Sequence, residues 1–262
     1  MSVIGSNILA GAAGQGGGYV IDNSLRLRSS ASAYLNRTFP SAGNKNKWTY
    51  SGWFKLGAAT AFRFIGTNAT IFGTPSTLGE LYLDGSSRLT FFQYTGGTTY
   101  SNVISTQVFR DPSAWYHIVC IYDDAQATAS NRVRMFVNGS EITSFSTAAY
   151  PSQNFTGFIN EPKPHVIGAY AATGGLYGDG YLTEVNFIDG QALTPSSFGD
   201  YNEDTGVWQP AKYAGSYGTN GFYLNFSDAT TTTTLAEDSS GNGNNWTPNN
   251  ISLTAGVTYD SM

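Results

Sequence analysis

The stretch WTYSGWFKL, residues 48–56, decides the fold class of this chain. Every second position carries an apolar residue or a glycine, namely Trp48, Tyr50, Gly52, Phe54 and Leu56. Side chains of an extended chain alternate between two faces, so these five residues share one face. The stretch therefore predicts a β-strand with one side against an apolar core.

A second stretch, RVRMFVNG at residues 132–139, alternates in the same way. One face carries Val133, Met135 and Val137, and the other carries Arg132, Arg134 and Phe136. Asn138-Gly139 supplies the positive φ values of a type I′ turn, after which residues 141–145 return antiparallel. Asp84-Gly85 is predicted to make the same turn between LGELYL and SSRLTFFQY.

The remaining sequence extends this all-β pattern and adds two extensions. No sustained 3.6-residue period occurs between Ile21 and Gly190, and one helical turn is expected near residues 194–198, where Pro195 follows Thr194. We assign residues 1–20 to a Gly/Ala-rich arm, 21–200 to a β-sandwich, and 201–262 to a C-terminal extension that packs on the sandwich or on a neighbouring subunit. The first segment is either a flexible terminus or an arm that orders against another chain during assembly. Its glycines are Gly11, Gly14, Gly16, Gly17 and Gly18.

Composition excludes several functional classes. The net charge of −5 argues against nucleic-acid binding, which usually needs a basic face. The single cysteine, Cys120, excludes an internal disulfide and a cysteine zinc site, and it reads as a small buried apolar residue. No stretch reaches the roughly 18 apolar residues of a membrane helix, and no signal peptide is evident, so we expect folding in a cytosol and no membrane insertion.

Nucleophilic catalysis has little support in the sequence. His117 lies in the middle of a strand pattern and reads as a satisfied core histidine, while an exposed position is open to His165 after Pro164. No G-x-S-x-G motif occurs, and the Gly-rich arm lacks the lysine and the hydroxyl residue of a phosphate-binding loop.

Three blocks in fixed order carry a family resemblance. They are residues 48–56, residues 115–142 (WYHIVCIYDD to NRVRMFVNGSEI) and residues 165–195 (HVIGAYAATGGLYGDGYLTEVNFIDGQALTP). Together they resemble laminin-G-like members of the concanavalin-A-like lectin/glucanase superfamily. The resemblance implies a jelly-roll β-sandwich, and it implies that Trp53, Trp115, His117, Asn138, Gly139 and Glu184 shape the sandwich.

The resemblance also bears on activity. Glucanases of this superfamily place their acids on one strand in an E-x-D-x-x-E pattern, because hydrolysis needs two carboxyl groups flanking the bond. The chain has no such run; Glu80 to Asp84 comes nearest, at the wrong spacing. We therefore expect a protein that is not an enzyme and requires no cofactor.

The arm and the extension, together with the sandwich, look most like structural proteins of tailed bacteriophages. This implies a virion protein made in the host cytoplasm, a tail fibre or tail-tip adhesin that binds host-surface polysaccharide. A capsid or tail decoration protein without a specific ligand is the alternative, and a depolymerase ranks below both. The expected partners are other virion proteins and copies of the same chain, as a homotrimer.

Two ligand sites are expected on the loops. Sugar rings stack on exposed aromatic residues, so Tyr170, Tyr177 and Tyr181 with Asp179 form the candidate glycan site. Laminin-G-like domains often carry calcium at a loop rim, and hard cations prefer clustered carboxylates. A calcium ion at Asp179, Asp123 and Asp124 is the second candidate.

Overall fold

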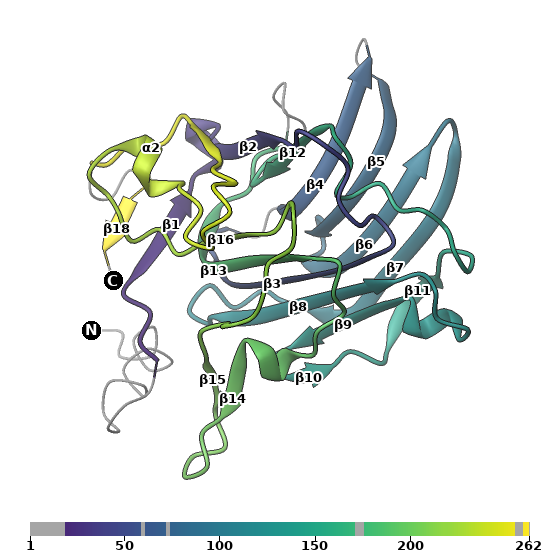
Figure 1. Cartoon of the computed structure of the whole chain (residues 1–262). Helices are drawn as coiled ribbons and strands as arrows, with labels where there is room; N and C mark the ends of the chain where they lie inside the picture. The colour runs from purple at the N-terminus through teal and green to yellow at the C-terminus, as the bar shows by residue number, and fades with distance from the viewer. Residues whose placement is uncertain (1–18, 59–60, 72–73, 171–175, 255–258, 262) are drawn as a thin grey trace.

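The computed structural model describes residues 19–58, 61–71, 74–170, 176–254 and 259–261. Most of its strands form two eight-stranded antiparallel sheets, called sheet A and sheet B, and the predicted all-β sandwich is confirmed (Figure 1). The order in sheet A is β10 (Ser140–Glu141), β9 (Val133–Val137), β8 (Tyr116–Asp123), β3 (Lys47–Leu56), β13 (Gly180–Asp189), β1 (Asn23–Leu27) and β18 (Tyr259–Ser261), with β16 (Phe222–Leu224) also on β13. The order in sheet B is β11 (Phe145–Ala149), β7 (Thr98–Val108), β6 (Arg88–Thr95), β5 (Thr74–Leu83), β4 (Phe62–Ile71), β12 (Pro164–Ile167), β2 (Tyr34–Thr38) and β17 (Thr247–Asn249).

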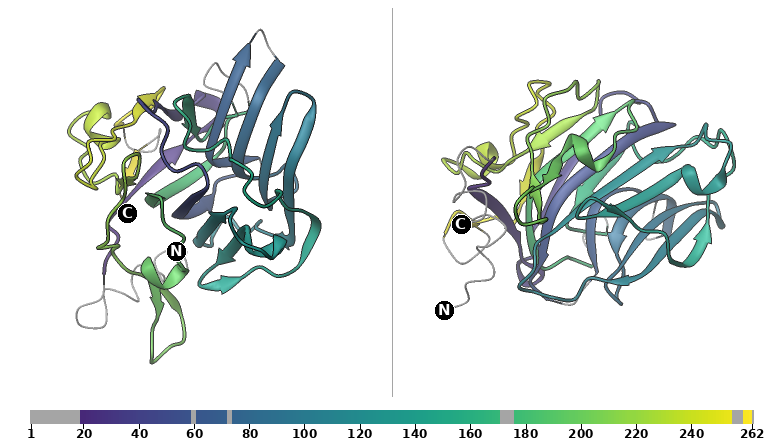
Figure 2. Two further views of the ribbon diagram at one scale, coloured as in Figure 1. Left: turned by 45° about the vertical axis from the view of Figure 1, so that its right-hand side comes forward. Right: turned by 90° about the horizontal axis from the view of Figure 1, so that it is seen from below.

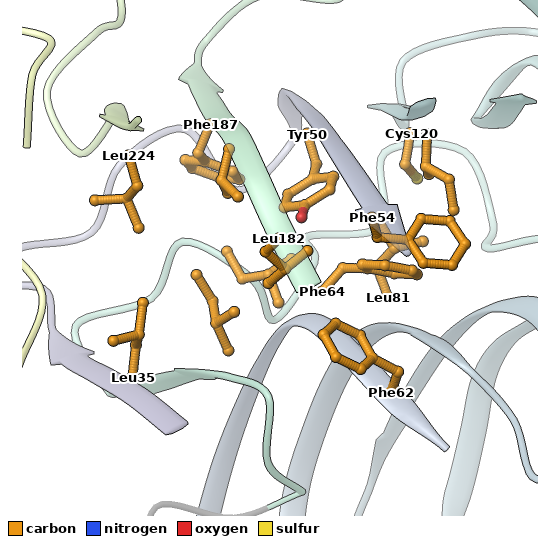
Figure 3. Packing of buried hydrophobic residues seen from close by; sticks show 14 of the residues in the cluster. Leu35, Tyr50, Phe54, Phe62, Phe64, Leu81, Cys120, Leu182, Phe187 and Leu224 are labelled. Atoms are coloured by element: carbon orange, nitrogen blue, oxygen red, sulfur yellow. The ribbon is translucent and has the colours of Figure 1, made fainter. Parts of the chain in front are cut away.

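The core lies between the two sheets and is rich in aromatic rings. Four of the five residues predicted on the inward face of β3 belong to it: Trp48, Tyr50, Phe54 and Leu56 are at most 1 % exposed. Rings and aliphatic side chains from both sheets meet in this cluster (Figure 3). Cys120 is buried in the same cluster, as its alternation with aliphatic residues indicated.

The turn at Asn138-Gly139 is confirmed, with φ values of 46° and 80°. The turn after β5 differs from its prediction. Gly85 is not in the left-handed region; Ser87 is, with φ 61°, and the Asp84 carboxylate accepts hydrogen bonds from the backbone N–H of Ser86 and Arg88. The hairpin of β5 and β6 is as predicted, but an aspartate-stabilised loop replaces the type I′ turn.

Residues of the C-terminal extension cover the outer face of sheet A. Tyr217 and Tyr223 pack on outward residues of β8, β9 and β13, while Trp208 packs on Trp53 and Trp115. Trp208 belongs to a separate hairpin of β14 (Gly199–Tyr201) and β15 (Trp208–Pro210), which extends away from the sandwich in Figure 1. Figure 2 shows the yellow C-terminal segments beside the purple N-terminal strands and away from β5, β6 and β7.

Helical structure is sparse in the described residues. The turn expected near residues 194–198 is present as a 3-10 helix, Pro195–Ser197, and two others span Ser29–Ala31 and Ala129–Asn131. The sequence pattern did not reveal α2 (Thr232–Leu235), which begins in a capping box between Thr231 and Thr234. No helix in the described part of the chain has the length and apolar character needed to span a bilayer.

Candidate functional site

Six half-buried aromatic rings gather over the outward side of sheet B. We call this surface the aromatic face and define it by Tyr34, Tyr82, Phe92, Tyr94, Tyr170 and Tyr177. Four of these rings stand on β2, β5 and β6 at positions that alternate with core residues such as Leu35 and Leu81. The other two come from the segment after β12: Tyr170 lies over Arg63, and Tyr177 contacts Tyr34 with ring centroids 5.9 Å apart.

The register of sheet B shows that these residues share a surface. One row of directly paired residues runs across six strands, and its members are Asn36, Val166, Gly66, Glu80, Phe92 and Asn102. An adjacent row includes Arg63 opposite Tyr82. From β2 to β6 the face crosses four strand spacings, or about 19 Å at the usual inter-strand distance. A ligand that touches both ends must therefore be extended.

A buried ion pair lies at the centre of the aromatic face. Arg63 Nε donates to Glu80 Oε1 over 3.4 Å, and both side chains are at most 5 % exposed. The Arg63 guanidinium also lies 5.1 Å from the Tyr82 ring centroid and 4.7 Å from that of Tyr170. The two rings and the carboxylate hold the cation in place, while its Nη1 has no hydrogen-bond partner.

Burial changes the acidity of the Glu80 carboxyl. It raises the pKa of the Glu80 carboxyl from its usual 4.5 to about 7, and the Arg63 guanidinium acts in the opposite direction. A carboxyl with this pKa changes charge near neutral pH, so the charge balance beneath Tyr170 depends on pH.

The aromatic face is suited to binding. Aromatic rings offer flat apolar surfaces, and the tyrosine hydroxyls, Asn36 and Asn102 offer hydrogen-bond donors and acceptors beside them. Glycoside hydrolysis needs two carboxyl groups about 5 to 9.5 Å apart. Among the described strand residues on this face, Glu80 carries the one carboxylate, and it is paired with Arg63.

The structure divides the four predicted glycan residues between two surfaces. Tyr170 and Tyr177 lie on the aromatic face. Tyr181 lies on sheet A, where its ring meets Trp115 at 6.3 Å and Arg26 at 5.3 Å. The Asp179 carboxylate instead accepts hydrogen bonds from the backbone and side chain of Ser29, which fixes the turn after β1.

The predicted calcium ligands are far apart, so the expectation that they share one rim is wrong. Asp123 pairs with Lys47 at the start of β3, whereas Asp179 accepts from the N–H of Gly57 just beyond the end of that strand. Ten residues of β3 separate the two ends by about 30 Å. Nowhere in the described ranges do three or more His, Cys, Asp or Glu side chains form a group able to hold a metal ion. The five glycines assigned to the assembly arm lie outside the described residues.

The sequence interpretation missed Arg63, Glu80 and Tyr82 as a group. A local signal was present, because Glu80 and Tyr82 alternate with the core residues Leu81 and Leu83. Their meeting with Arg63 depends on the pairing of β4 with β5, and Tyr170 joins them from about a hundred residues away in sequence. Alternation assigns a face to each residue but does not say which strands lie side by side.

Comparison with known proteins places these features in a family context. The profile described as the concanavalin A-like lectin/glucanases superfamily matches residues 29–197. A search of curated protein sequences found no match.

Several solved structures match parts of this chain. One is a Bacteroides ovatus protein proposed to bind carbohydrate, with a TM-score of 0.55 and 16% identity; the match covers 93% of this chain and 61% of that protein. A heptameric pentraxin from Limulus polyphemus gives a TM-score of 0.44 at 15% identity, covering 66% of this chain and 78% of the other. Domains LG4-5 of the mouse laminin alpha1 chain give 0.43 at 14% identity, covering 80% and 49%.

Proposed function

The chain belongs to the concanavalin A-like lectin/glucanases superfamily, and from this premise we propose that its aromatic face binds a carbohydrate chain. The observation that carries the proposal is the set of six half-buried rings around the Arg63–Glu80 pair. Half-buried rings are rigid and already positioned, so a sugar can stack on them at little cost in side-chain entropy. The proposed carbohydrate binding of the Bacteroides ovatus relative agrees with this assignment.

The ligand is an oligosaccharide or polysaccharide. The rings extend from Tyr34 on β2 to Tyr94 on β6, a distance of about 19 Å across the strands, which one sugar unit cannot cover. Tyr94 stacks in parallel on its neighbour Phe92, with centroids 6.2 Å apart. Two subsites follow, one near Tyr34 and Tyr177 and one near Phe92 and Tyr94, with Tyr170 between them.

The test is a binding screen of the full chain against a glycan array, followed by affinity measurement on the best polysaccharide. Tyr170→Ala and Tyr94→Ala are each expected to weaken binding at least tenfold, which corresponds to about 1.4 kcal/mol. Tyr201→Ala is the matched control, because this ring is 46% exposed on the β14–β15 hairpin of the other side. Absence of binding to every glycan, or equal loss in all three variants, would reject the proposal.

We further propose that the protein is a bacteriophage virion component, as its sequence resemblance implies, and acts as a tail-fibre or tail-tip adhesin in a homotrimer. The positions of the described chain ends support an adhesin that is attached through sheet A and faces the host with sheet B. Tyr19, the first described residue, is fixed on sheet A by a hydrogen bond to Glu184, and β18 pairs at the edge of the same sheet. The aromatic face belongs to sheet B, so attachment through the chain ends leaves it free for a host surface.

Virions carrying Tyr170→Ala distinguish an adhesin from a decoration protein. If the protein is an adhesin, these virions assemble with normal amounts of the chain and adsorb to host cells more slowly than wild-type virions. Unchanged adsorption, with normal incorporation, would support decoration alone. Chemical cross-linking of the purified chain tests the trimer.

A further inference from the structure

A polar pocket of about 770 Å³ lies on the outer face of sheet A, far from the aromatic face. The strand register builds its floor. Asp123 on β8 lies opposite Lys47 on β3, and Ile121 lies opposite Arg134 on β9. Its volume is within the usual range of small-molecule sites, about 300 to 1,000 Å³.

The charges on the pocket floor cancel in pairs. Lys47 Nζ lies 3.3 Å from Asp123 Oδ2. Arg134 donates twice to Glu141, from Nε over 2.8 Å and from Nη2 over 2.6 Å. Two cations therefore meet two carboxylates, and the pocket offers no excess charge of either sign. This balance favours an uncharged, polar ligand over an anion or a cation.

One oxygen on the floor lacks a hydrogen-bond partner. Asp123 is 5% exposed; its Oδ2 meets Lys47 and accepts from Gln126 Nε2 over 2.9 Å, but Oδ1 is buried with no donor. A buried acceptor without a partner has lost its hydrogen bonds to water and gained none in return, which is unfavourable. A ligand that donates a hydrogen bond to Oδ1 would recover part of this cost.

The pocket walls are held in place by the protein itself. On one side the Arg132 guanidinium donates to three backbone carbonyls, those of Gln126, Ala127 and Pro151. On the other side Thr49 Oγ1 donates to the carbonyl of Gln191 and accepts from the N–H of Leu193. Because both walls are fixed, a ligand would pay little to order them.

We propose that this pocket is a second ligand site, which takes a neutral saccharide unit with two adjacent free hydroxyl groups. One hydroxyl donates to Asp123 Oδ1, and its neighbour accepts from Lys47 Nζ. Ile121 and Leu193 supply an apolar patch for the C–H groups of the sugar ring. This site is independent of the aromatic face, because it lies on the other sheet and uses none of the same residues.

The test uses the full chain and three probes, the methyl glycosides of mannose, glucose and galactose. Saturation-transfer NMR should show saturable binding of at least one probe. Asp123→Asn replaces one carboxylate oxygen by an NH2 group, which donates and cannot accept, and the remaining oxygen stays with Lys47 and Gln126. Ala192→Trp fills the pocket mouth from an exposed loop position. Each pocket variant is expected to weaken probe binding at least tenfold, while Val207→Ala, at an exposed position outside both sites, leaves it unchanged.

Several results would overturn the inference. No saturable signal from any of the three glycosides would reject the saccharide site. Binding that survives both pocket variants but disappears in Tyr170→Ala would assign the probe to the aromatic face and leave the proposed function standing. Binding of calcium alone, lost in Asp123→Asn and unaccompanied by a glycoside signal, would assign a cation to the pocket instead.

Discussion

Trp208 donates its indole Nε1–H to Nδ1 of His117 over 3.0 Å, although 91 residues separate them in sequence. Because Nδ1 accepts, the neutral imidazole carries its proton on Nε2, which donates to Ser51 Oγ over 2.8 Å. Both ring nitrogens are therefore satisfied within the protein. This contact joins the β14–β15 hairpin to the centre of the outer face of sheet A.

Replacing Trp208 should loosen this attachment in two steps. Trp208→Phe leaves the buried Nδ1 without a donor, and we expect a loss of about 1 to 3 kcal/mol in the free energy of unfolding. Trp208→Ala also removes the packing on Trp53 and Trp115, for a total of about 3 to 5 kcal/mol. Urea unfolding measures both. Val207→Ala, at a 46% exposed neighbour, is the control and should stay within about 0.5 kcal/mol; a Phe variant as stable as this control would refute the role of the hydrogen bond.

Because two histidines are buried, we expect the stability of the fold to fall at acid pH. Burial lowers the pKa of His117 to about 3 and that of His165 to about 4, from an ordinary 6.5. The unfolded chain then binds more protons than the fold below about pH 6.5, so stability present above that pH is lost as pH falls. Each histidine lowers the free energy of unfolding by up to roughly 1.4 kcal/mol for each pH unit of acidification. Urea unfolding at several pH values should show the decline, and His165→Gln should flatten it; an unchanged slope would exclude His165 as a contributor.

Glu80 should change the pH dependence of stability in the direction opposite to the two histidines. Its pKa is about 7 in the fold and 4.5 ordinarily, so the fold holds the proton more tightly. The cost of ionising it is absent below about pH 4.5 and complete above about pH 7, and this carboxyl therefore lowers stability as pH rises. Compared with wild type, Glu80→Gln should gain up to about 3 kcal/mol between these limits. Unfolding measured near pH 5 and pH 8 tests this; a constant difference between the two proteins would contradict it.

Gly139 should tolerate no side chain beside Trp208. Its φ is 80°, and a Cβ built there would lie 2.5 Å from the Trp208 ring. Gly139→Ala therefore combines left-handed strain, about 1 to 2 kcal/mol, with a clash of about 1 to 3 kcal/mol. Gly190→Ala is a matched control, because its φ is 89° but a Cβ built there would lie 3.9 Å from its nearest neighbour, Asn44. Unfolding by urea should show the larger loss at Gly139, and equal losses would disprove the clash.

Alternation and turn motifs in the sequence were sufficient to predict the β-sandwich and one of its turns. Period-two alternation identified the core side of β3, and Asn138-Gly139 identified the turn after β9, because both depend on residues close in sequence. The same logic misjudged Asp84-Gly85, where the carboxylate organises a different loop.

Long-range relationships were beyond the sequence pattern. The sequence allowed His165 to be exposed, but the structure buries its side chain completely. Its Nε2 accepts a hydrogen bond from the N–H of Asn160, and its Nδ1 contacts the Lys163 carbonyl. Asp123 and Asp179 were placed together although β3 holds them apart, because loop membership does not reveal which end of a strand a loop occupies.

The placement of Tyr19 and β18 on sheet A has a practical consequence for anyone handling this protein. A dye or a bead linker attached at the described ends of the chain, Tyr19 or Ser261, should lie on the side of sheet A. Immobilised in this way, the molecules would present the rings of sheet B toward the solution, which makes the chain a convenient scaffold for displaying redesigned sugar receptors.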